Sequence, residues 1–564
     1  MNNSKKFKDP IYGYIDIPDS LIFGIIDSPS FQRLRRIVQT SYAPLYSSAV
    51  HNRFVHSLGV YHLGRIAGET LSEEVIKKTV NEDDEPKKEA VRRLSFLFSV
   101  ACLLHDVGHA PFSHTGEDFY LEPNSDPSAI HKILKDVIDD GSFSKDVPVD
   151  KSAAAAPHEI MSAIIGVKEY NSVFHDNEEK SFFARCITGY KYTVSSEENS
   201  IKNCFIGLLN SKVIDVDKLD YLIRDAYITG FDTVKIDYYR LLTSITIVPV
   251  STPAETDGEQ QEAQEGEICY EPAYYKGAFS VIENVVFAHD AERKWIQSHP
   301  IILYESYLLR HVMKMLAEKL DSPDARLFSM QSLSVEGHVL GSGDYIRLLS
   351  DDDIVFLMKK YYDENQLVRE FFDRRSRRHP IWKSEAEYKV LFLDIAGGGK
   401  ILDALEKAME NTAEYLFKSA ESWVINKELV NTLKNEIDEI DKNLVLIHEK
   451  RTREAQKTEK KNILKVSECL TNYADEVGYA GDYILIKASQ FNSGFLKPDF
   501  SDTKIVFPSR EGDVIGLFTE KISSYGGIGA IRDKFFYLFY DRNANNGCNI
   551  DISQLCRCLI KEFV

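Results

Sequence analysis

Apolar residues recur with helical spacing through much of this chain. In residues 90–104, Leu94, Leu97, Ala101 and Leu104 form one stripe with other apolar residues around it, which predicts a buried helix. The glycine and proline in the following HDVGHAP predict that this helix ends soon after residue 106. Helical spacing also predicts helices within residues 157–167, 212–229 and 279–320.

A different pattern occupies residues 244–275. The runs SITIVPV and EICYEPAYY are rich in β-branched and aromatic residues, so we expect a small β-hairpin. Between them lies STPAETDGEQQEAQEGE, with six acidic residues and no basic one. Such a segment cannot bury enough apolar surface to order itself. We therefore expect a disordered acidic loop at about residues 251–267.

The C-terminal part combines long helices with short strands. Residues 400–475 are rich in Glu, Lys, Leu and Ala without proline, which predicts one or two long exposed helices. Their apolar spacing is not sustained enough for a coiled coil. The tail contains the strand-like runs DYILIKAS, TKIVFP and FFYLFY and a last helix, ISQLCRCLIKEF. The predicted fold is mainly α: a helical bundle with a small β-hairpin, followed by a mixed α/β C-terminal region containing long helices.

Composition narrows the class of protein. A chain of 564 residues is too long for one core, so two to four domains are expected. The net charge of −19 does not favour nucleic acid as a partner. No apolar run is long enough to span a membrane, and the N-terminus lacks the apolar region of a signal peptide. Eight scattered cysteines without a CxxC pair indicate free thiols, and hence a cytoplasmic location.

The stretch HDVGHAPFSH, residues 105–114, holds the densest candidate chemistry, with three histidines and one aspartate. Adjacent residues on a helix point about 100° apart, yet both can ligate one ion where the helix ends. A histidine nitrogen and an aspartate oxygen suit Fe, Mn, Ni, Co or Mg. An HD dipeptide by itself is usually a surface pair, and two ligands do not complete a site. Further ligands must come from elsewhere in the chain.

Two other segments supply candidates. HNRFVHSLGV, residues 51–60, contains two histidines and an arginine, and SKVIDVDKLDYLIRDAYITG, residues 211–230, contains four aspartates. Asp217, Asp220 and Tyr221 are three and four positions apart, so they share one helix face. A solvated amphipathic helix is the simpler explanation. Acidic residues dispersed among apolar core positions, however, are more often functional or paired.

Together these motifs resemble those of the HD-domain phosphohydrolases. The pattern is most similar to the dNTP triphosphohydrolase branch, which includes the deoxyguanosine triphosphatases and the SAM-and-HD-domain dNTPases. FKDPIYGYI and IIDSPSFQRLRRIVQT follow the same branch, and the resemblance covers about residues 5–320 without a SAM domain. It implies an HD phosphohydrolase core at 1–330. A helical region at 331–480 and a small α+β region at 481–564 would follow.

The resemblance also implies roles for particular residues. The four metal ligands would be His56, His105, Asp106 and Asp217. A second Mg ion bound with the substrate is also implied. The catalytic group would comprise His109, His114, Glu117 and His158. In it, His114 would protonate the leaving oxygen and Glu117 would orient His114. His51 has no ligand role in the pattern, and we expect it to support the fold or the ligands.

Substrate contacts follow in the same way. The phosphates would meet Arg53 and Lys218, and the sugar would meet Gln39, Tyr221 and Asp225. The residue after Gln39 is usually a leucine that presses on the 2′ carbon, but here it is Thr40. We expect a hydroxyl at this point to tolerate a ribose 2′-OH and therefore to weaken selectivity for deoxyribose.

Residues 285–300 depart further from the family pattern. Where the family has a phosphate-binding arginine and a tyrosine beside the base, this chain has His289 and Gln297. Arg293, between them, is the remaining candidate for the phosphate contact. The family's nucleotide-activator site would map to Lys5, Asp27 and Arg35.

The resulting expectation is a metal-dependent enzyme that hydrolyses (deoxy)nucleoside triphosphates to nucleoside and inorganic triphosphate. It would bind a nucleotide substrate and a nucleotide activator, and it would form a homo-oligomer. Two alternatives stay open. One is an HD-family phosphatase or phosphodiesterase acting on another nucleotide. The other is a nucleotide-sensing assembly protein, against which the complete ligand set argues.

Overall fold

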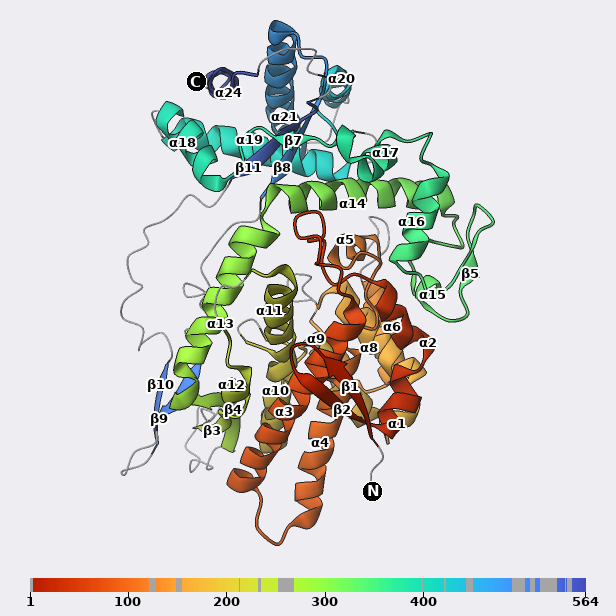
Figure 1. Ribbon diagram of the computed structural model, residues 1–564, viewed down its shortest axis with the longest axis vertical. Coiled ribbons are helices and arrows are strands. Elements are labelled where there is room, and N and C mark those ends of the chain that lie inside the picture. The colour runs from red at the N-terminus through yellow and green to blue at the C-terminus, as the bar shows by residue number, and fades with distance from the viewer. Residues whose placement is uncertain are drawn as a thin grey trace. The chain divides into compact units, whose positions relative to one another are not determined.

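The computed structural model is mainly helical, as predicted, and its chain forms two compact units (Figure 1). It describes residues 4–120, 128–148, 155–211, 214–231, 235–251, 268–396, 399–419, 422–442, 450–488, 503–507, 513–517, 535–542, 544 and 550–563. The first unit comprises residues 1–292, 320–355 and 492–528, and the second comprises 293–319, 356–491 and 529–564. The boundaries expected at residues 330 and 480 stay a prediction.

Helices make up most of the first unit. In chain order its longer helices are α3 (Arg53–Thr79), α4 (Glu85–Leu104), α6 (Ser128–Ile138), α8 (Pro157–Glu169), α9 (Asn177–Thr188), α10 (Glu197–Leu209), α11 (Val216–Thr229) and α13 (Phe279–Glu292). The shorter ones are α1 (Asp19–Leu21), η1 (Ile22–Ile26), α2 (Pro29–Arg33), η2 (Leu34–Arg36), α5 (His114–Glu117), η3 (Asp118–Tyr120), α7 (Gly141–Asp146), η5 (Asn171–Val173), α12 (Tyr238–Leu242), η6 (Lys276–Ala278) and α15 (Met330–Leu333). Helix α16 (Asp351–Lys360) begins in this unit. The helices predicted within 90–104, 157–167 and 212–229 are confirmed by α4, α8 and α11.

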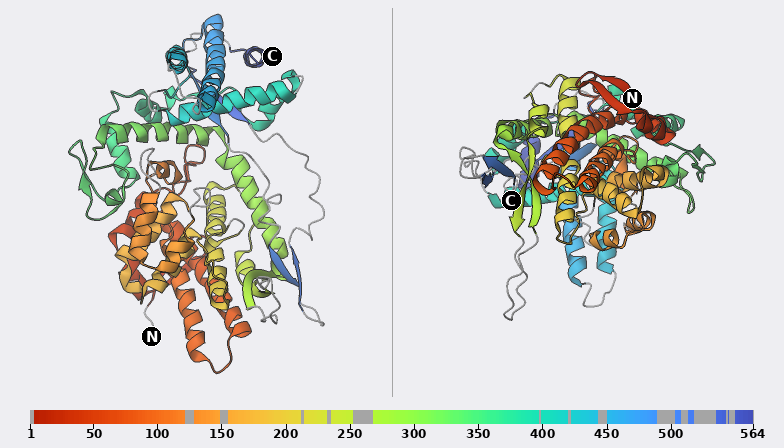
Figure 2. Two further views of the ribbon diagram at one scale, coloured as in Figure 1. Left: turned by 180° about the vertical axis from the view of Figure 1, so that it is seen from behind. Right: turned by 90° about the horizontal axis from the view of Figure 1, so that it is seen from below.

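The antiparallel pair α3 and α4 forms the central hairpin of this unit, and the two helices lie side by side in both figures (Figures 1 and 2). Each begins at a side-chain cap, because Asn52 accepts from the Val55 amide and Asp84 accepts from the Lys87 amide. Close packing depends on Gly64, since a Cβ there would lie 2.4 Å from the sulfur of Cys102. The hairpin therefore brings the start of α3 to the end of α4.

The described strands of the first unit form three small sheets. Strands β1 (Ser4–Asp9) and β2 (Gly13–Pro18) pair antiparallel, as do β5 (His338–Val339) and β6 (Tyr345–Ile346). The predicted hairpin is formed by β3 (Ile245–Ser251) and β4 (Ile268–Tyr275), and the acidic loop at 252–267 lies outside the described residues. Strand β9 (Lys504–Phe507) from the C-terminal tail pairs parallel to β4, and β10 (Val514–Leu517) extends the sheet. The tail thus completes a sheet in the first unit, which the strand-like run alone did not reveal.

The second unit contains the long helices expected at 400–475. They are α19 (Gly399–Lys418), α20 (Lys427–Lys442) and α21 (Lys450–Val477), and α20 and α21 pack against each other. Its other helices are η7 (Arg293–Gln297), α14 (Pro300–Leu320), α17 (Gln366–Phe372), η8 (Arg374–Ser376), α18 (Glu385–Ala396) and α24 (Ile552–Lys561). A sheet in the order β7 (His379–Pro380), β11 (Phe536–Tyr540), β8 (Tyr483–Lys487) completes the unit.

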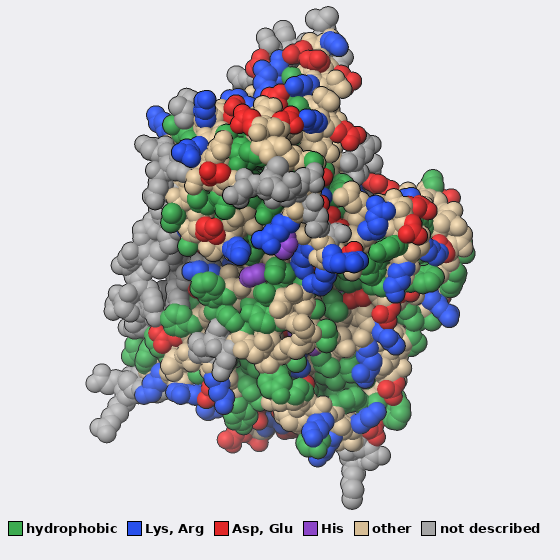
Figure 3. Space-filling model, turned by 45° about the horizontal axis from the view of Figure 1, so that its top comes forward, with side chains coloured by type: hydrophobic (Ala, Val, Ile, Leu, Met, Phe, Trp, Pro, Cys, Tyr) green, Lys and Arg blue, Asp and Glu red, His purple; other side chains and the backbone are tan. Residues whose placement is uncertain are grey.

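The surface carries charge of both signs. On the face drawn in Figure 3, Lys and Arg side chains lie among Asp, Glu and apolar side chains. Within the described parts of the chain, every helix is too short or too polar to cross a lipid bilayer. The described cysteines are all free thiols, as predicted.

Candidate metal centre and catalytic cluster

Four side chains from separated segments meet where α4 ends. We call them the metal cluster: His56 on α3, His105 and Asp106 directly after α4, and Asp217 on α11. The His56 Nε2 atom lies 2.9 Å from Asp217 Oδ1 and 3.6 Å from Asp106 Oδ2. The His105 Nε2 atom lies 3.4 Å from Asp106 Oδ1 and 3.6 Å from Asp217 Oδ1. The structure thus brings together all four residues predicted as metal ligands.

Hydrogen bonds on the far side of each ring set its orientation. His105 Nδ1 donates to the Cys102 carbonyl at 2.9 Å, and His56 Nδ1 donates to Asp220 Oδ2 at 2.7 Å. Both Nε2 atoms therefore face the carboxylates. Within the described chain, the buried His105 Nε2 has no hydrogen-bond partner. Two imidazoles and two carboxylates that converge in this way, each ring held by an outer acceptor, fit a divalent transition metal.

Electrostatics keep the carboxylates of the metal cluster ionised. Burial raises the pKa of Asp106, but Arg53, His105 and His56 together outweigh it and lower that pKa to about 2. The Arg53 Nη1 atom lies 2.7 Å from Asp106 Oδ2. Burial likewise opposes ionisation of Asp217, yet the neighbouring imidazoles of His105 and His56 hold its pKa well below the usual value. Ionised carboxylates are the form that binds a cation.

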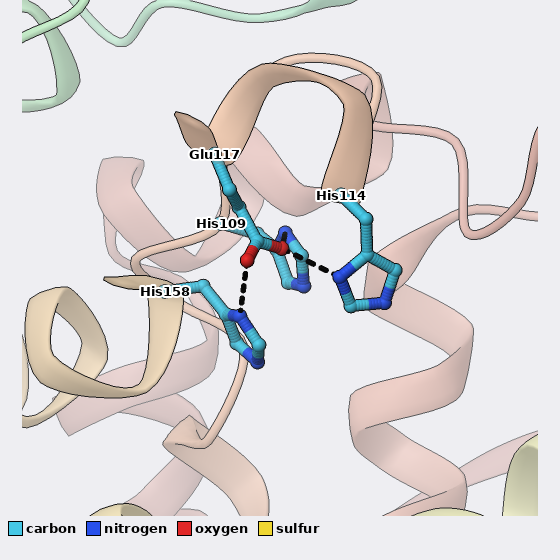
Figure 4. Close-up of side chains that lie close together, drawn as sticks. All are labelled: His109, His114, Glu117 and His158. Atoms are coloured by element: carbon cyan, nitrogen blue, oxygen red, sulfur yellow. Dashed lines mark ion pairs between the residues drawn. The ribbon is translucent and has the colours of Figure 1, made fainter. Parts of the chain in front are cut away.

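A second group of side chains, which we call the histidine cluster, consists of His109, His114, Glu117 and His158 (Figure 4). The carboxylate of Glu117 lies between two rings, 2.7 Å from His114 Nδ1 and 2.9 Å from His158 Nδ1. The rings of His109 and His158 stack with centroids 4.2 Å apart. Three segments supply the group: the turn after α4, the short helix α5 and the first turn of α8.

Proton affinities differ within the histidine cluster. Burial lowers the pKa of His158, but Glu117 raises it more, to about 9. Burial raises the pKa of Glu117, yet the two histidines bring it far below its usual value. His109 is fully buried, and burial followed by the charge of Arg53 lowers its pKa well below the usual value. The cluster thus combines a neutral imidazole with a charged one. The same four side chains are also of the kinds that bind a metal ion. We favour a role in proton transfer, because Glu117 already forms ion pairs with two of the histidines.

The part of the chain that carries both histidine-rich motifs is similar to a known protein family. Residues 53–139 match the family model described as HD domain, and they include the three metal-cluster residues His56, His105 and Asp106. The chain carries an HD domain.

Relatives of this HD domain are known by name. An uncharacterised protein, YwfO, of Bacillus subtilis is 31% identical over 245 residues, covering 43% of this chain and 44% of that protein. The deoxynucleoside triphosphate triphosphohydrolase SAMHD1 homologue of Dictyostelium discoideum is 32% identical over 248 residues, covering 43% of this chain and 39% of that protein. The SAMHD1 enzyme of Danio rerio is 31% identical, covering 42% of this chain and 36% of that protein. The similarity thus spans less than half the length of these relatives.

One solved structure shows the same fold over nearly the whole chain. The crystal structure of a phosphohydrolase from Bacteroides thetaiotaomicron superposes with a TM-score of 0.50 at 18% identity, covering 96% of this chain and 100% of that one. At this identity the likeness concerns the fold alone.

The residues predicted to bind phosphate already have partners around the HD domain. Arg53 is buried, and it donates to Asp106, to Ser113 Oγ and to the Gln39 carbonyl. Lys218 Nζ lies 2.5 Å from Asp215 Oδ2, and Asp215 also caps α11. Both cations therefore stand beside the metal cluster while neutralising carboxylates. Their contact with phosphate stays a prediction.

The predicted sugar contacts come from α11 and from the loop before α3. Tyr221 follows Asp217 by one helical turn, and burial raises its pKa well above the usual value. Asp225 is buried, and its Oδ1 atom lies 2.7 Å from His51 Nε2. The loop before α3 carries Gln39 and Thr40, whose buried Oε1 and Oγ1 atoms have no hydrogen-bond partner among the described residues. Buried polar atoms normally have a hydrogen-bond partner, and a hydroxyl group of a bound sugar would supply one here.

The roles expected for two further sets of residues stay predictions. Arg293 and Gln297 lie in η7 of the second unit, so the phosphate contact of Arg293 stays a prediction. For the expected activator site, Lys5 lies exposed on β1, Asp27 lies exposed after η1, and the Arg35 guanidinium stacks on the Phe54 ring. No described contact joins these three residues, and the activator site stays a prediction as well.

Sequence reasoning missed the carboxylate that orients the metal cluster. Asp220 is fully buried, and its side chain binds His56 Nδ1, the Arg224 guanidinium and the Tyr12 hydroxyl. A Cβ at Gly59 would lie 1.9 Å from Asp220 Oδ1, so the glycine makes room for this carboxylate. The signal was present in the spacing, because Asp217 and Asp220 share a helix face and both reach His56.

Proposed function

We propose that this chain is a metal-dependent phosphohydrolase that hydrolyses (deoxy)nucleoside triphosphates to nucleoside and inorganic triphosphate. The observation that carries the proposal is the contact between the two clusters, where His109 Nε2 lies 3.6 Å from Asp106 Oδ1. The metal cluster and the histidine cluster thus lie against each other, an arrangement that suits metal-assisted hydrolysis of a phosphate ester with proton transfer by a nearby imidazole. The SAMHD1 relatives, named as deoxynucleoside triphosphate triphosphohydrolases, support the choice of substrate.

The residues have separate tasks in this proposal. A divalent ion, of Fe, Mn, Ni, Co or Mg, would supply an activated water and polarise a phosphoryl oxygen. His158, kept charged by Glu117, attracts the phosphate together with Arg53 and Lys218. His114 gives its proton to the departing 5′ oxygen. Its side chain is 72% exposed and therefore accessible to a substrate, and Glu117 orients the ring through Nδ1. The products are the nucleoside and inorganic triphosphate.

Substrate recognition rests on the loop before α3 and on α11. Gln39, Tyr221 and Asp225 would contact the sugar. Thr40 supports a second candidate, an HD-family phosphatase or phosphodiesterase that accepts ribonucleotides or other nucleotides. Its buried Oγ1 has no partner among the described residues, so a 2′-hydroxyl would find a hydrogen bond there. A nucleotide activator, a second Mg bound with the substrate and a homo-oligomer complete the proposal.

Product analysis tests the proposal most directly. The purified chain is incubated with each dNTP and NTP, with and without Mn²⁺ and with and without GTP, and the products are separated by ion-exchange chromatography. Release of inorganic triphosphate supports the main proposal, whereas release of phosphate or of a monophosphate supports the second candidate. His105→Ala is the matched control, and it should bind less metal and lose activity. A protein that binds no metal and hydrolyses none of these nucleotides would overturn both enzymatic candidates and leave the nucleotide-sensing assembly protein as the remaining alternative.

A further inference from the structure

The turn that joins the two clusters has a strained backbone. Phe112 and Ser113 are consecutive and have φ values of 55° and 54°, in the left-handed region that side chains other than glycine avoid. They lie between His109 and His114, so the turn sets the separation of two members of the histidine cluster. Strain of this kind persists only where surrounding contacts hold the backbone in place.

Asp351, the first residue of α16, supplies one of these contacts. Its side chain is buried, with 7% of the residue exposed, although it is a carboxylate. One oxygen accepts a hydrogen bond from the Phe112 amide at 2.6 Å, and the other accepts from the Val38 amide at 2.8 Å. Asp351 thus ties the strained turn to the loop before α3. Val38 is also held by Ser113, whose hydroxyl donates to its carbonyl.

Arg33, the last residue of α2, supplies the second contact. Its guanidinium is also buried, with 4% of the residue exposed. Nη2 donates to the carbonyls of Val107 and His109 at 2.8 and 2.9 Å, and Nη1 donates to the carbonyl of Leu349 at 2.8 Å. The same cation therefore holds the turn and the segment that carries Asp351.

The segment that carries Asp351 is itself strained. Among the described residues, four other than glycine have positive φ: Phe112, Ser113, Asp139 and Leu348. Phe112 and Ser113 lie in the turn that Arg33 and Asp351 contact, and Leu348 lies in the segment that carries Asp351. Concentrated strain beside catalytic groups is a mark of a preorganised site. Neither Arg33 nor Asp351 belongs to residues 53–139, which match the HD domain.

We propose that Asp351 and Arg33 are positioning residues, which clamp the strained turn so that His109 and His114 are held in the geometry of the reaction. The inference rests on the proposed function. Neither side chain reaches the metal cluster, so the clamp acts on catalysis through the backbone of the turn. Its loss should lower kcat, because a displacement of about 1 Å in a catalytic group can cost about 10²-fold.

The test compares two neighbouring aspartates. Asp351→Asn keeps the shape but turns an amide NH2 toward one of the two backbone N–H donors, which leaves that donor without an acceptor. Asp352→Asn is the matched control, since Asp352 is exposed and pairs with the exposed Arg36. At pH 8, above the pKa of about 7 to which burial raises Asp351, both carboxylate oxygens of the wild type accept hydrogen bonds. Arg33→Lys is the second variant, because an ammonium cannot span the three carbonyls.

We expect Asp351→Asn and Arg33→Lys to lower kcat by about 10²-fold, with KM and bound metal per chain unchanged, while Asp352→Asn matches the wild type. Hydrogen exchange at residues 107–116, followed by mass spectrometry, should be faster in both clamp variants than in the control. Unchanged kcat, or a loss of kcat that only follows a loss of bound metal or of folded protein, would overturn the inference. If the wild type hydrolyses no nucleotide but exchange still accelerates, the proposed function fails and the clamp stands. If exchange is unchanged, the clamp itself is refuted.

Discussion

Replacing Glu117 with glutamine removes the carboxylate that His114 and His158 share in the histidine cluster. Burial lowers the pKa of His158, yet the charge and hydrogen bond of Glu117 raise it from 6.5 to about 9. Each pKa unit corresponds to about 1.4 kcal/mol, so protonated His158 contributes about 3 kcal/mol to the free energy of unfolding. In Glu117→Gln only the charges of Glu159 and Asp106 still oppose burial, so the pKa of His158 should fall and the ring should lose its proton at lower pH.

The sign follows from proton binding. Between about pH 6.5 and pH 9 the folded protein holds the proton on His158 while the unfolded chain has released it. The contribution is therefore fully present below pH 6.5 and is lost as the pH rises through 9. We expect the melting temperature of the wild type to fall by roughly 5 °C more than that of Glu117→Gln over this window.

Thermal unfolding followed by fluorescence at pH 6.5 and pH 9 measures this difference. Comparing the two proteins cancels the contribution of His56, whose pKa is also raised to about 9 and which both proteins retain. His175→Gln is the control, because it removes an exposed histidine that also faces a glutamate. Equal falls in melting temperature for the wild type and Glu117→Gln would refute the argument that this ion pair holds the proton.

Three further outcomes are expected. Asp220→Asn weakens the acceptor that orients His56, so Mn²⁺ affinity measured by calorimetry should fall by about 10- to 100-fold, and an unchanged affinity would contradict that role. Thr40→Leu removes the buried hydroxyl, so the ratio of kcat/KM for dNTPs over NTPs should rise by roughly 10-fold, and a constant ratio would separate Thr40 from sugar selection. Chelation of bound metal should lower the melting temperature, and Mn²⁺ should restore it in the wild type but not in His105→Ala, since a ligand that binds only the folded state stabilises it.

Much of the helical architecture could be predicted because burial in a helix has a local period. The apolar stripe from Leu94 to Leu104 indicated α4, and its end follows directly from the glycine and proline of the next turn. The parallel pairing of β9 with β4 could not be predicted in this way. Pairing between strands more than 200 residues apart depends on which sheet edge is unpaired in the folded chain. The sequence of a short apolar run does not indicate which edge that is.

The metal cluster could be predicted because the motifs that carry it resemble those of a known family. His56, His105, Asp106 and Asp217 have the required nitrogen and oxygen donors, and the resemblance to HD-domain phosphohydrolases ranked them above other polar residues. The partners of these ligands were harder to identify. Asp220 and Asp351 are two aspartates among many, and only their burial and hydrogen bonds show what each one holds.

The sequence by itself determined the place of helices such as α4, α8 and α11 and which side chains have the chemistry to bind a metal or carry a proton. Capping residues, apolar periods and donor atoms are properties of a few neighbouring residues. Only the tertiary structure decided that Arg33 and Asp351 hold the strained turn from segments on either side of the HD domain. The physical reason is that a buried charge is tolerated only where folding supplies its partners, and those partners come from residues far apart in the chain.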